Sequence, residues 1–224
     1  MTVQARISNM SSDINPDVFP HDRIALFSDA VFAIAITLLV IEIKIPTHAE
    51  VHALGLAGAL RGMIPLFVGY LVSFLVITLF WVGHMKTWKY VTSATSGMVW
   101  LNIFELLFVA LMPFTTGMYS EYFGDDLAFS LYCLNLVGIA VFSYWLRSVV
   151  IRREGLVEKL GAHEVAWLRA QTMIAMLVFI ACMLLASVTP WLARYGLIAI
   201  FVLQWVMKRY LNRRERQRLA TAAG

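Results

Sequence analysis

The sequence is poor in charged residues and nearly free of cysteine. Only 14% of its 224 residues are charged and 60% are apolar, whereas a soluble domain is about 25% charged and about 45–50% apolar. This departure excludes a soluble enzyme, a disordered chain and a secreted disulfide scaffold. The two cysteines, Cys133 and Cys182, lie inside apolar runs. We therefore expect them to be small core residues and not a disulfide or a metal site.

Several functional motifs are missing as well. The chain has no phosphate-binding P-loop, no H-E-x-x-H zinc motif and no nucleophile elbow, so we expect neither an enzyme nor a cofactor site. The string Val68-Gly69-Tyr70 matches part of a potassium filter, but no pore loop surrounds it and we attribute the match to chance. Residues 1–22 lack the apolar core of a signal peptide and are expected to form a cytoplasmic N-terminal segment.

Long apolar segments are what the chain has in abundance. They cover residues 23–43, 63–81, 97–118, 127–145, 172–188 and 191–207. Each is long enough, or nearly so, to cross about 30 Å of hydrocarbon as a helix. A barrel is disfavoured because its strands would alternate between polar and apolar residues. The sequence therefore predicts an all-α, polytopic membrane protein, with six transmembrane helices in a domain over residues 23–208.

The distribution of basic residues predicts the orientation. Six spans place both termini on one side of the membrane, and that side carries all Lys and Arg residues except Lys44, Arg61 and Arg194. The positive-inside rule therefore places both termini in the cytoplasm. The connection over residues 146–171 mixes charged and apolar residues and is expected to form an amphipathic interfacial helix. The basic tail, residues 209–224, is expected to lie over anionic lipid; nothing else in the sequence supports a nucleic-acid-binding arm.

Polar side chains inside the spans are candidate functional residues, because burying them in lipid is costly. Asp29 lies roughly 9 Å along its helix from Arg23 and needs a partner. Arg23, His84 and Asn102 all fall near the cytoplasmic side, so we expect a hydrogen-bonded network at the inner ends of the first three spans. The residues alone leave open whether this network serves function or only holds the helices together, and whether Glu105 joins it or faces a subunit contact. Glu42 and Lys44 are expected at the outer interface.

The first span and two later segments resemble a known family. Residues Arg23, Phe27, Ser28 and Asp29 form an R-x-x-x-F-S-D pattern at the start of the first membrane helix. The strings F-W-V-G-H from Phe80 and L-N-I-F-E-L-L-F-V-A-L-M-P-F from Leu101 follow in order. Together they resemble the transmembrane protein 175 family, the lysosomal potassium channels of animals and their prokaryotic relatives, over residues 23–118.

The resemblance implies a bacterial inner-membrane homotetramer in which the first helix of each chain lines a central potassium-selective pore. By position after the motif, it implies an aliphatic constriction at Ile34, with Leu38 and Ile41 above it, and a selectivity position at Thr37. The same resemblance implies a supporting network of Trp81, His84 and Asn102. Potassium is then the permeant ion, lipid and further copies of the chain are the partners, and no cofactor is involved.

The geometry of a helix agrees with this assignment, because it places the implied pore residues and Asp29 on different faces of the first span. At about 100° per residue, Phe27, Leu38 and Ile41 fall within roughly 40° of Ile34, whereas Asp29 lies roughly 140° away. Spacing alone also fits ordinary lipid-facing residues, since every face of this helix is apolar. The alternatives to a potassium channel are a weakly selective proton or monovalent-cation leak, a secondary transporter, and a membrane-bound enzyme or assembly factor. A transporter would be indicated by inverted repeats and broken helices, and we find neither.

Overall fold

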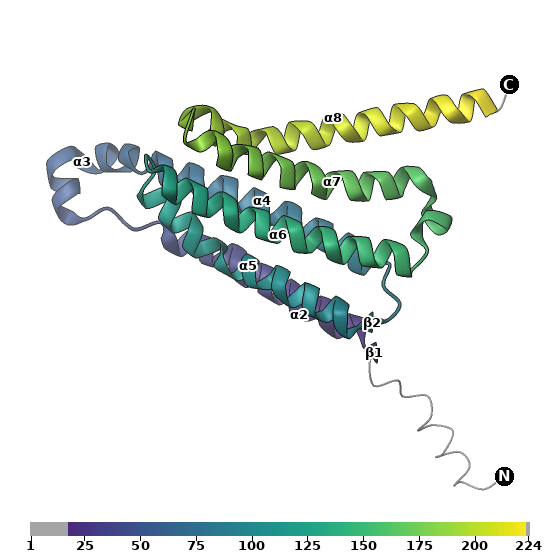
Figure 1. The fold of residues 1–224 in the computed structure, drawn as a ribbon. Helices are drawn as coiled ribbons and strands as arrows, with labels where there is room; N and C mark the ends of the chain where they lie inside the picture. The colour runs from purple at the N-terminus through teal and green to yellow at the C-terminus, as the bar shows by residue number, and fades with distance from the viewer. Residues whose placement is uncertain (1–17, 223–224) are drawn as a thin grey trace, which may run out of the picture.

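The computed structural model describes residues 18–222, with the backbone alone for residues 18, 157, 190, 191, 194 and 214–222. In this part the chain forms seven α-helices, one 3₁₀ segment and two short strands, drawn in Figure 1. They are β1 (Val18–Phe19), α2 (His21–Leu38), η1 (Leu39–Glu42), α3 (His48–Gly62), α4 (Ile64–Trp88), β2 (Ala94–Thr95), α5 (Ser96–Glu121), α6 (Asp126–Arg153), α7 (Leu156–Ala186) and α8 (Pro190–Ala222).

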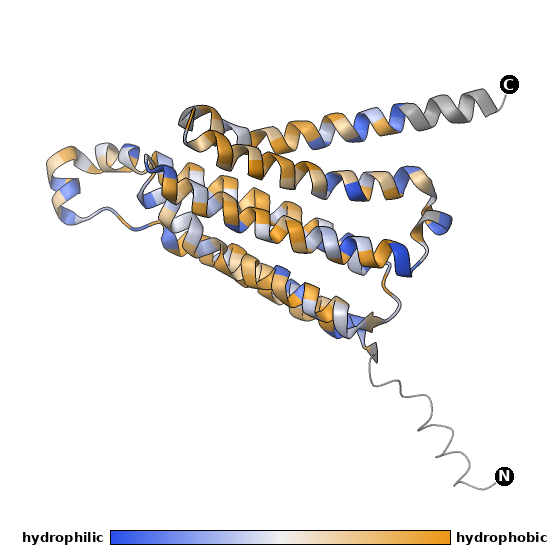
Figure 2. Cartoon of the chain, in the orientation of Figure 1, coloured by the Kyte–Doolittle hydropathy of each residue, from blue (hydrophilic) through white to orange (hydrophobic). Residues whose placement is uncertain are grey.

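The long helices run up and down through one bundle. Helix α2 packs against α5 and α4, α6 packs against α5 and α7, and α7 packs against α8. Helices α2 and α8 therefore lie on opposite sides of the bundle, and α2 begins at the same end at which α8 finishes (Figure 1). Figure 2 shows apolar residues along the middle of the helices and polar residues gathered toward their ends, which is the pattern of membrane-crossing helices.

Five segments within the described residues are long and apolar enough to cross a membrane. They are His21–Glu42, His48–Trp88, Ser96–Glu121, Asp126–Arg153 and Glu158–Ala186. These segments contain the first five predicted spans, apart from residue 43 of the first and residues 187–188 of the fifth. The sixth predicted span begins α8, which is a continuous helix but is not one of the five. The polytopic all-α class is thus confirmed, while the sixth crossing stays a prediction.

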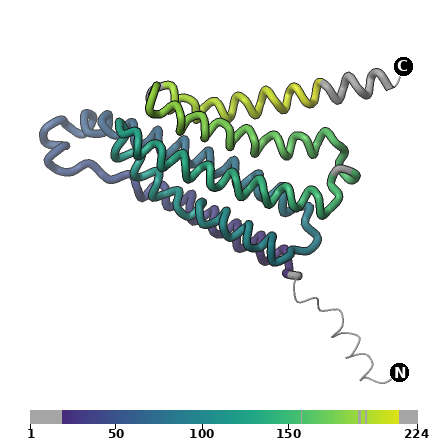
Figure 3. Tube along the Cα trace, in the orientation of Figure 1, coloured from purple at the N-terminus to yellow at the C-terminus, as the bar shows by residue number. Residues whose placement is uncertain are grey.

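The predicted ends of the helices are wrong at the end of the bundle where α2 begins. Helix α6 runs to Arg153 and α7 begins at Leu156, with a break at Gly161, so residues 146–171 extend two long helices and do not form one separate helix. Figure 3 shows the chain leaving α6, making a short coil and then running back as α7; φ values of 60° at Gly155 and 82° at Gly161 mark the turn and the break within α7. The apolar residues of this stretch explain the correction, because Leu146, Val150, Leu156 and Leu168 pack into a buried cluster.

The outer connection after η1 forms a helix that the sequence did not reveal. Helix α3 begins with a capping box, in which Thr47 Oγ1 accepts from the Glu50 N–H at 3.3 Å and Glu50 Oε2 accepts from the Thr47 N–H at 2.7 Å. A break at Gly55, with a φ of 70°, divides it. Figure 1 shows α3 standing beyond the end of the bundle.

The core lies between α2, α4, α5, α6, α7 and α8 and is rich in aromatic residues. Its largest fully buried side chains include Phe32, Phe129, Tyr132 and Phe179. Cys133 and Cys182 are buried in the same cluster as free thiols, so their prediction as core residues is confirmed.

Gly138 of α6 allows a close contact with α5. A Cβ atom at this position would stand 2.5 Å from Phe108 Cδ1, so we expect Gly138→Ala to force the ring aside. Overpacking of this kind costs about 1–3 kcal/mol, and each kcal/mol lowers the melting temperature by about 2–4 °C in a chain of this size. Gly97→Ala is the control, because a Cβ there meets nothing within 4 Å. Equal melting temperatures for the two variants would contradict this packing.

Candidate functional site

Helix α2 has two unlike faces. Ser28, Phe32 and Ala35 are buried against the bundle, and Leu39 of η1 continues this stripe. On the other side Phe27, Ile34, Leu38 and Ile41 are exposed, with Ile34 at 58% and Ile41 at 68%. The three implied constriction residues, and Phe27 of the motif on the same face, therefore point away from their own bundle. Such a face suits either lipid or the axis of an assembly, as the spacing indicated.

Thr37 lies close to this exposed face. Its hydroxyl donates a hydrogen bond to the Ile34 carbonyl oxygen at 2.9 Å, one helical turn earlier. The bond holds the hydroxyl against the backbone of the helix. It also ties the implied selectivity position directly to the residue implied at the constriction.

The buried face of α2 is held by a hydrogen-bonded pair from the expected network. Ser28 Oγ accepts from Asn102 Nδ2 of α5 at 3.0 Å and donates to the Ile24 carbonyl oxygen at 2.8 Å. Both side chains are almost fully buried. Asn102 therefore anchors α2 to α5 at the level of the F-S-D motif.

Asp29 has a different partner from those predicted. Its Oδ1 accepts from Trp81 Nε1 of α4 at 2.8 Å, and neither Arg23 nor His84 bonds to it. Arg23 is exposed and has no hydrogen bond or ion pair to any described residue. The physical reason is helical phase: six residues separate Arg23 from Asp29, which places them roughly 120° apart around the axis.

Glu105 joins the network, which decides a question that the sequence left open. Its Oε2 lies 3.3 Å from His84 Nδ1, and its Oε1 accepts from Ser143 Oγ of α6 at 2.5 Å. The His84 ring also contacts Phe32 of α2 and Trp88, with centroids 5.3 and 6.0 Å away. His84 thus connects α4 with both α2 and the buried carboxylate. Ser143 gave no signal in the sequence, since a serine in an apolar helix is common.

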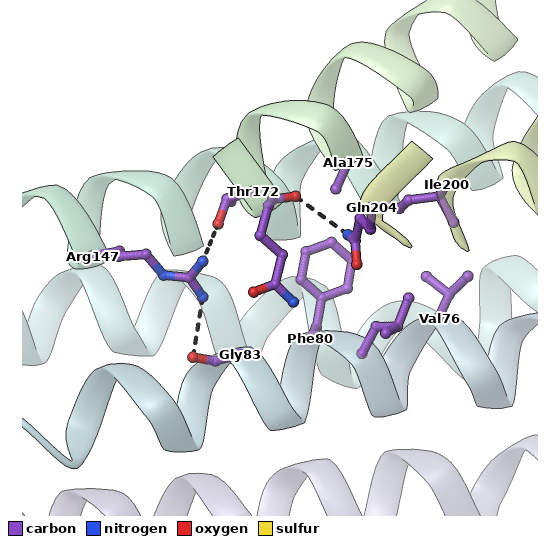
Figure 4. Close-up of a pocket in the computed structure, with 10 residues that line it drawn as sticks. Val76, Phe80, Gly83, Arg147, Thr172, Ala175, Ile200 and Gln204 are labelled. Atoms are coloured by element: carbon purple, nitrogen blue, oxygen red, sulfur yellow. Dashed lines mark hydrogen bonds between the residues drawn. The ribbon is translucent and has the colours of Figure 1, made fainter. Parts of the chain in front are cut away.

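Arg147 is the residue for which the predicted and observed positions of the side chain differ most. Its charge was assigned to the cytoplasmic connection, yet the side chain is only 5% exposed. Figure 4 shows its guanidinium lying between α4 and α7, with hydrogen bonds to Gly83 and Thr172. The apolar segment ends at Trp145, but α6 continues past it, so Arg147 faces the interior of the bundle.

Further polar groups link the outer halves of the helices. Ser73 Oγ lies 3.0 Å from both Tyr132 Oη and Thr116 Oγ1, which connects α4, α5 and α6. At the outer end Lys44 forms an exposed ion pair of 3.3 Å with Glu121. Glu42 lies against Gly117 of α5. No group of three or more His, Cys, Asp or Glu side chains suited to a metal ion occurs in the described part of the chain.

These features define a polytopic α-helical membrane protein. Its first helix presents an apolar stripe outward and is held on its other side by a part-buried hydrogen bond to α4 and a buried one to α5. Comparison with known proteins agrees with this class. The family model described as "Endosomal/lysosomal potassium channel TMEM175" matches residues 23–113. The matched segment contains α2, α4 and nearly all residues of the polar network, apart from Ser143 and Arg147.

The similarity extends beyond that segment. A potassium channel from Chamaesiphon minutus is 32% identical over 182 residues, which cover 80% of this chain and 90% of the relative. A potassium channel from Streptomyces collinus is 41% identical over 123 residues, 53% of this chain and 59% of the relative. The crystal structure of a lysosomal potassium-selective channel TMEM175 homolog from Chamaesiphon minutus superposes with a TM-score of 0.74 at 28% identity, covering 84% of this chain and 97% of that one. The chain belongs to the TMEM175 family.

Proposed function

We propose that this protein is a potassium channel of a bacterial inner membrane, a homotetramer with six spans per chain and both termini in the cytoplasm. Residues 1–22 and 209–224 are its cytoplasmic segments, and residues 23–208 its channel domain. It is not an enzyme and uses no cofactor. The observation that carries the proposal is the exposed apolar stripe of α2, with hydrogen bonds that join Asp29 and Ser28 on its other side to the bundle.

The proposed conduction path runs along that stripe. Four copies of α2 around an axis bring four Ile34 side chains together, with Leu38 and Ile41 above them. A narrow apolar constriction excludes water and opposes the passage of an ion until it widens. The polar residues behind α2 then hold the helix at a fixed rotation, so that Ile34 faces the axis and Asp29 does not.

Ion flux into liposomes tests this proposal. Purified protein is reconstituted and potassium uptake is compared with sodium uptake, with a protonophore present to remove any limitation by proton counterflow. Potassium flux that exceeds sodium flux is the expected result. Absence of flux for both ions would contradict the channel and favour a secondary transporter.

A proton or monovalent-cation leak is the second candidate function. It is favoured by the vertebrate relatives, of which one from Gallus gallus bears the name "Endosomal/lysosomal proton channel TMEM175" and is 31% identical over 67% of this chain and 33% of its own. In the same liposomes, acidification of the lumen without a protonophore and equal potassium and sodium fluxes would favour this candidate.

A substitution at Thr37 should change the selectivity for potassium over sodium with little loss of stability. Thr37→Val keeps the shape of the side chain but removes the hydroxyl that bonds to the Ile34 carbonyl oxygen. We expect the ratio of potassium to sodium permeability to fall, because the backbone at the constriction loses a fixed dipole, while the melting temperature stays within about 2 °C, as for other exposed sites. Reversal potentials in mixed potassium and sodium solutions measure the ratio. An unchanged ratio would remove Thr37 from the selectivity mechanism.

A further inference from the structure

A small cavity lies between α4, α6, α7 and α8, away from the exposed face of α2. Its volume is about 20 Å³. The polar residues around it are Gly83, Arg147, Gln171, Thr172 and Gln204, and apolar residues such as Phe80 complete the wall. Figure 4 shows Arg147 and Thr172 at one side and Gln204 at the other. The site shares no residue with the proposed constriction.

Arg147 is buried with one hydrogen-bond donor left over. Its Nε donates to Thr87 Oγ1 at 3.1 Å, its Nη1 to Thr172 Oγ1 at 2.5 Å and to the Leu168 carbonyl oxygen at 2.7 Å, and its Nη2 to the Gly83 carbonyl oxygen at 3.1 Å. A guanidinium has five N–H groups, so one N–H on Nη2 has no acceptor among the described residues. A Cβ at Gly83 would stand 2.8 Å from Nη2, so only glycine admits the guanidinium here.

Gln171 supplies a buried hydrogen-bond acceptor that lacks a donor within the described part of the chain. This side chain is 9% exposed, and its Oε1 is buried with no donor among the described residues. Its backbone carbonyl oxygen accepts from Gln204 Nε2 at 3.3 Å, which ties α7 to α8 beside the cavity. A buried acceptor without a donor lowers the stability of the fold. A buried donor of a charged group that has no acceptor lowers it as well.

We propose that the cavity binds one water molecule, which accepts from Arg147 Nη2 and donates to Gln171 Oε1. A cavity holds a water when it offers about 10–15 Å³ or more and at least two polar partners, and this cavity meets both conditions. A halide ion satisfies Arg147 alone, because it has no proton to donate to Gln171. An apolar molecule satisfies neither group.

The bound water gives the peripheral helices a polar attachment to α4. Arg147 already joins α6 to Gly83 and Thr87 of α4 and to Leu168 and Thr172 of α7. With the water in place, the chain of bonds continues through Gln171 to Gln204 of α8. The inference holds whether or not α2 lines a pore, since it depends only on contacts within one chain.

Replacing Gln171 by methionine separates a hydrated cavity from a dry one. In a dry cavity Gln171→Met removes an unsatisfied acceptor, and the melting temperature should rise. In a hydrated cavity the variant deprives the water of a partner and Arg147 of its fifth acceptor, so we expect a fall of about 2–4 °C. Leu177→Met is the matched control, because Leu177 lies on the same helix but is exposed, and it should leave the melting temperature unchanged. A rise or no change for Gln171→Met would overturn the proposal.

A high-resolution experimental structure of the unaltered protein provides a second measurement that does not depend on the variant. The expected result is an isolated density peak within about 3.2 Å of both Arg147 Nη2 and Gln171 Oε1. Crystals grown in bromide distinguish the ligands: an anomalous peak at this position would replace the water with an anion and overturn the proposal. An ordered cavity without any peak would overturn it as well.

Discussion

Ile34→Asn should increase ion flux and weaken the preference for potassium over sodium. The side chain is 58% exposed on the stripe that we propose to face the axis, so the change would add four amide groups to the proposed constriction of the proposed tetramer. Amides hydrate a constriction that aliphatic side chains keep dry. A barrier lowered by about 1.4 kcal/mol raises flux about tenfold, and a hydrated ring discriminates less between two hydrated cations.

Val40→Asn is the matched control for this experiment. Val40 is also an exposed aliphatic residue, at 51%, near the end of the same helical segment. It lies roughly 120° around the axis from Ile34 and therefore off the proposed pore face. The measurement is potassium and sodium flux into liposomes at matched protein content. Wild-type flux and selectivity for Ile34→Asn, or equal effects of the two variants, would contradict a constriction at Ile34.

The sequence predicted the helices well and their partners poorly. The six apolar segments lie within helices apart from one or two residues at their ends, because a membrane span must be a long apolar helix and few other sequences satisfy that demand. The ends of the helices were predicted less well than their existence. Helix α4 continues to Trp88 and α6 to Arg153, since a helix does not stop where its apolar run stops. Arg147 was placed outside the bundle for that reason.

For the polar network, the sequence likewise identified most of the residues but not the bonds between them. The sequence identified a motif and a supporting network, made up of Arg23, Ser28, Asp29, Trp81, His84 and Asn102. The structure brings all of them but Arg23 together between α2, α4 and α5. The sequence did not identify which residue bonds to which, because that depends on the rotation of each helix about its axis. Ser143 and Gln171 were overlooked because neither polar residue stands out before the helices are packed.

Asp29→Ala should lower both the stability of the chain and the fraction that assembles as a tetramer. The variant removes the acceptor of the 2.8 Å bond from Trp81 Nε1. A hydrogen bond to a charged group contributes about 1.5–3 kcal/mol, and its loss leaves the indole N–H of Trp81 without a partner. Without this bond, α2 is held only by its packing and by the bond from Asn102 to Ser28, so the stripe that we propose to meet the other three chains is held less firmly in place.

The control for this variant is Asp22→Ala, on the same helix. The Asp22 side chain is 83% exposed and contacts only its neighbour His21, so its loss should change neither property. Melting temperature and native mass spectrometry in mild detergent measure stability and assembly. A stable tetramer formed by Asp29→Ala, with normal potassium flux, would show that the bond to Trp81 does not position α2.

A double-mutant cycle with Trp81→Phe separates the bond from other effects of the two substitutions. If Asp29 acts through the indole N–H, the double variant should lose little more stability than Asp29→Ala alone, because both changes remove the same interaction. Fully additive losses would mean that each residue acts independently, Trp81 through packing and Asp29 through some other contact. The first outcome assigns the aspartate of the F-S-D motif a mechanical role, that of fixing the rotation of α2 so that its apolar stripe, and not its carboxylate, faces outward.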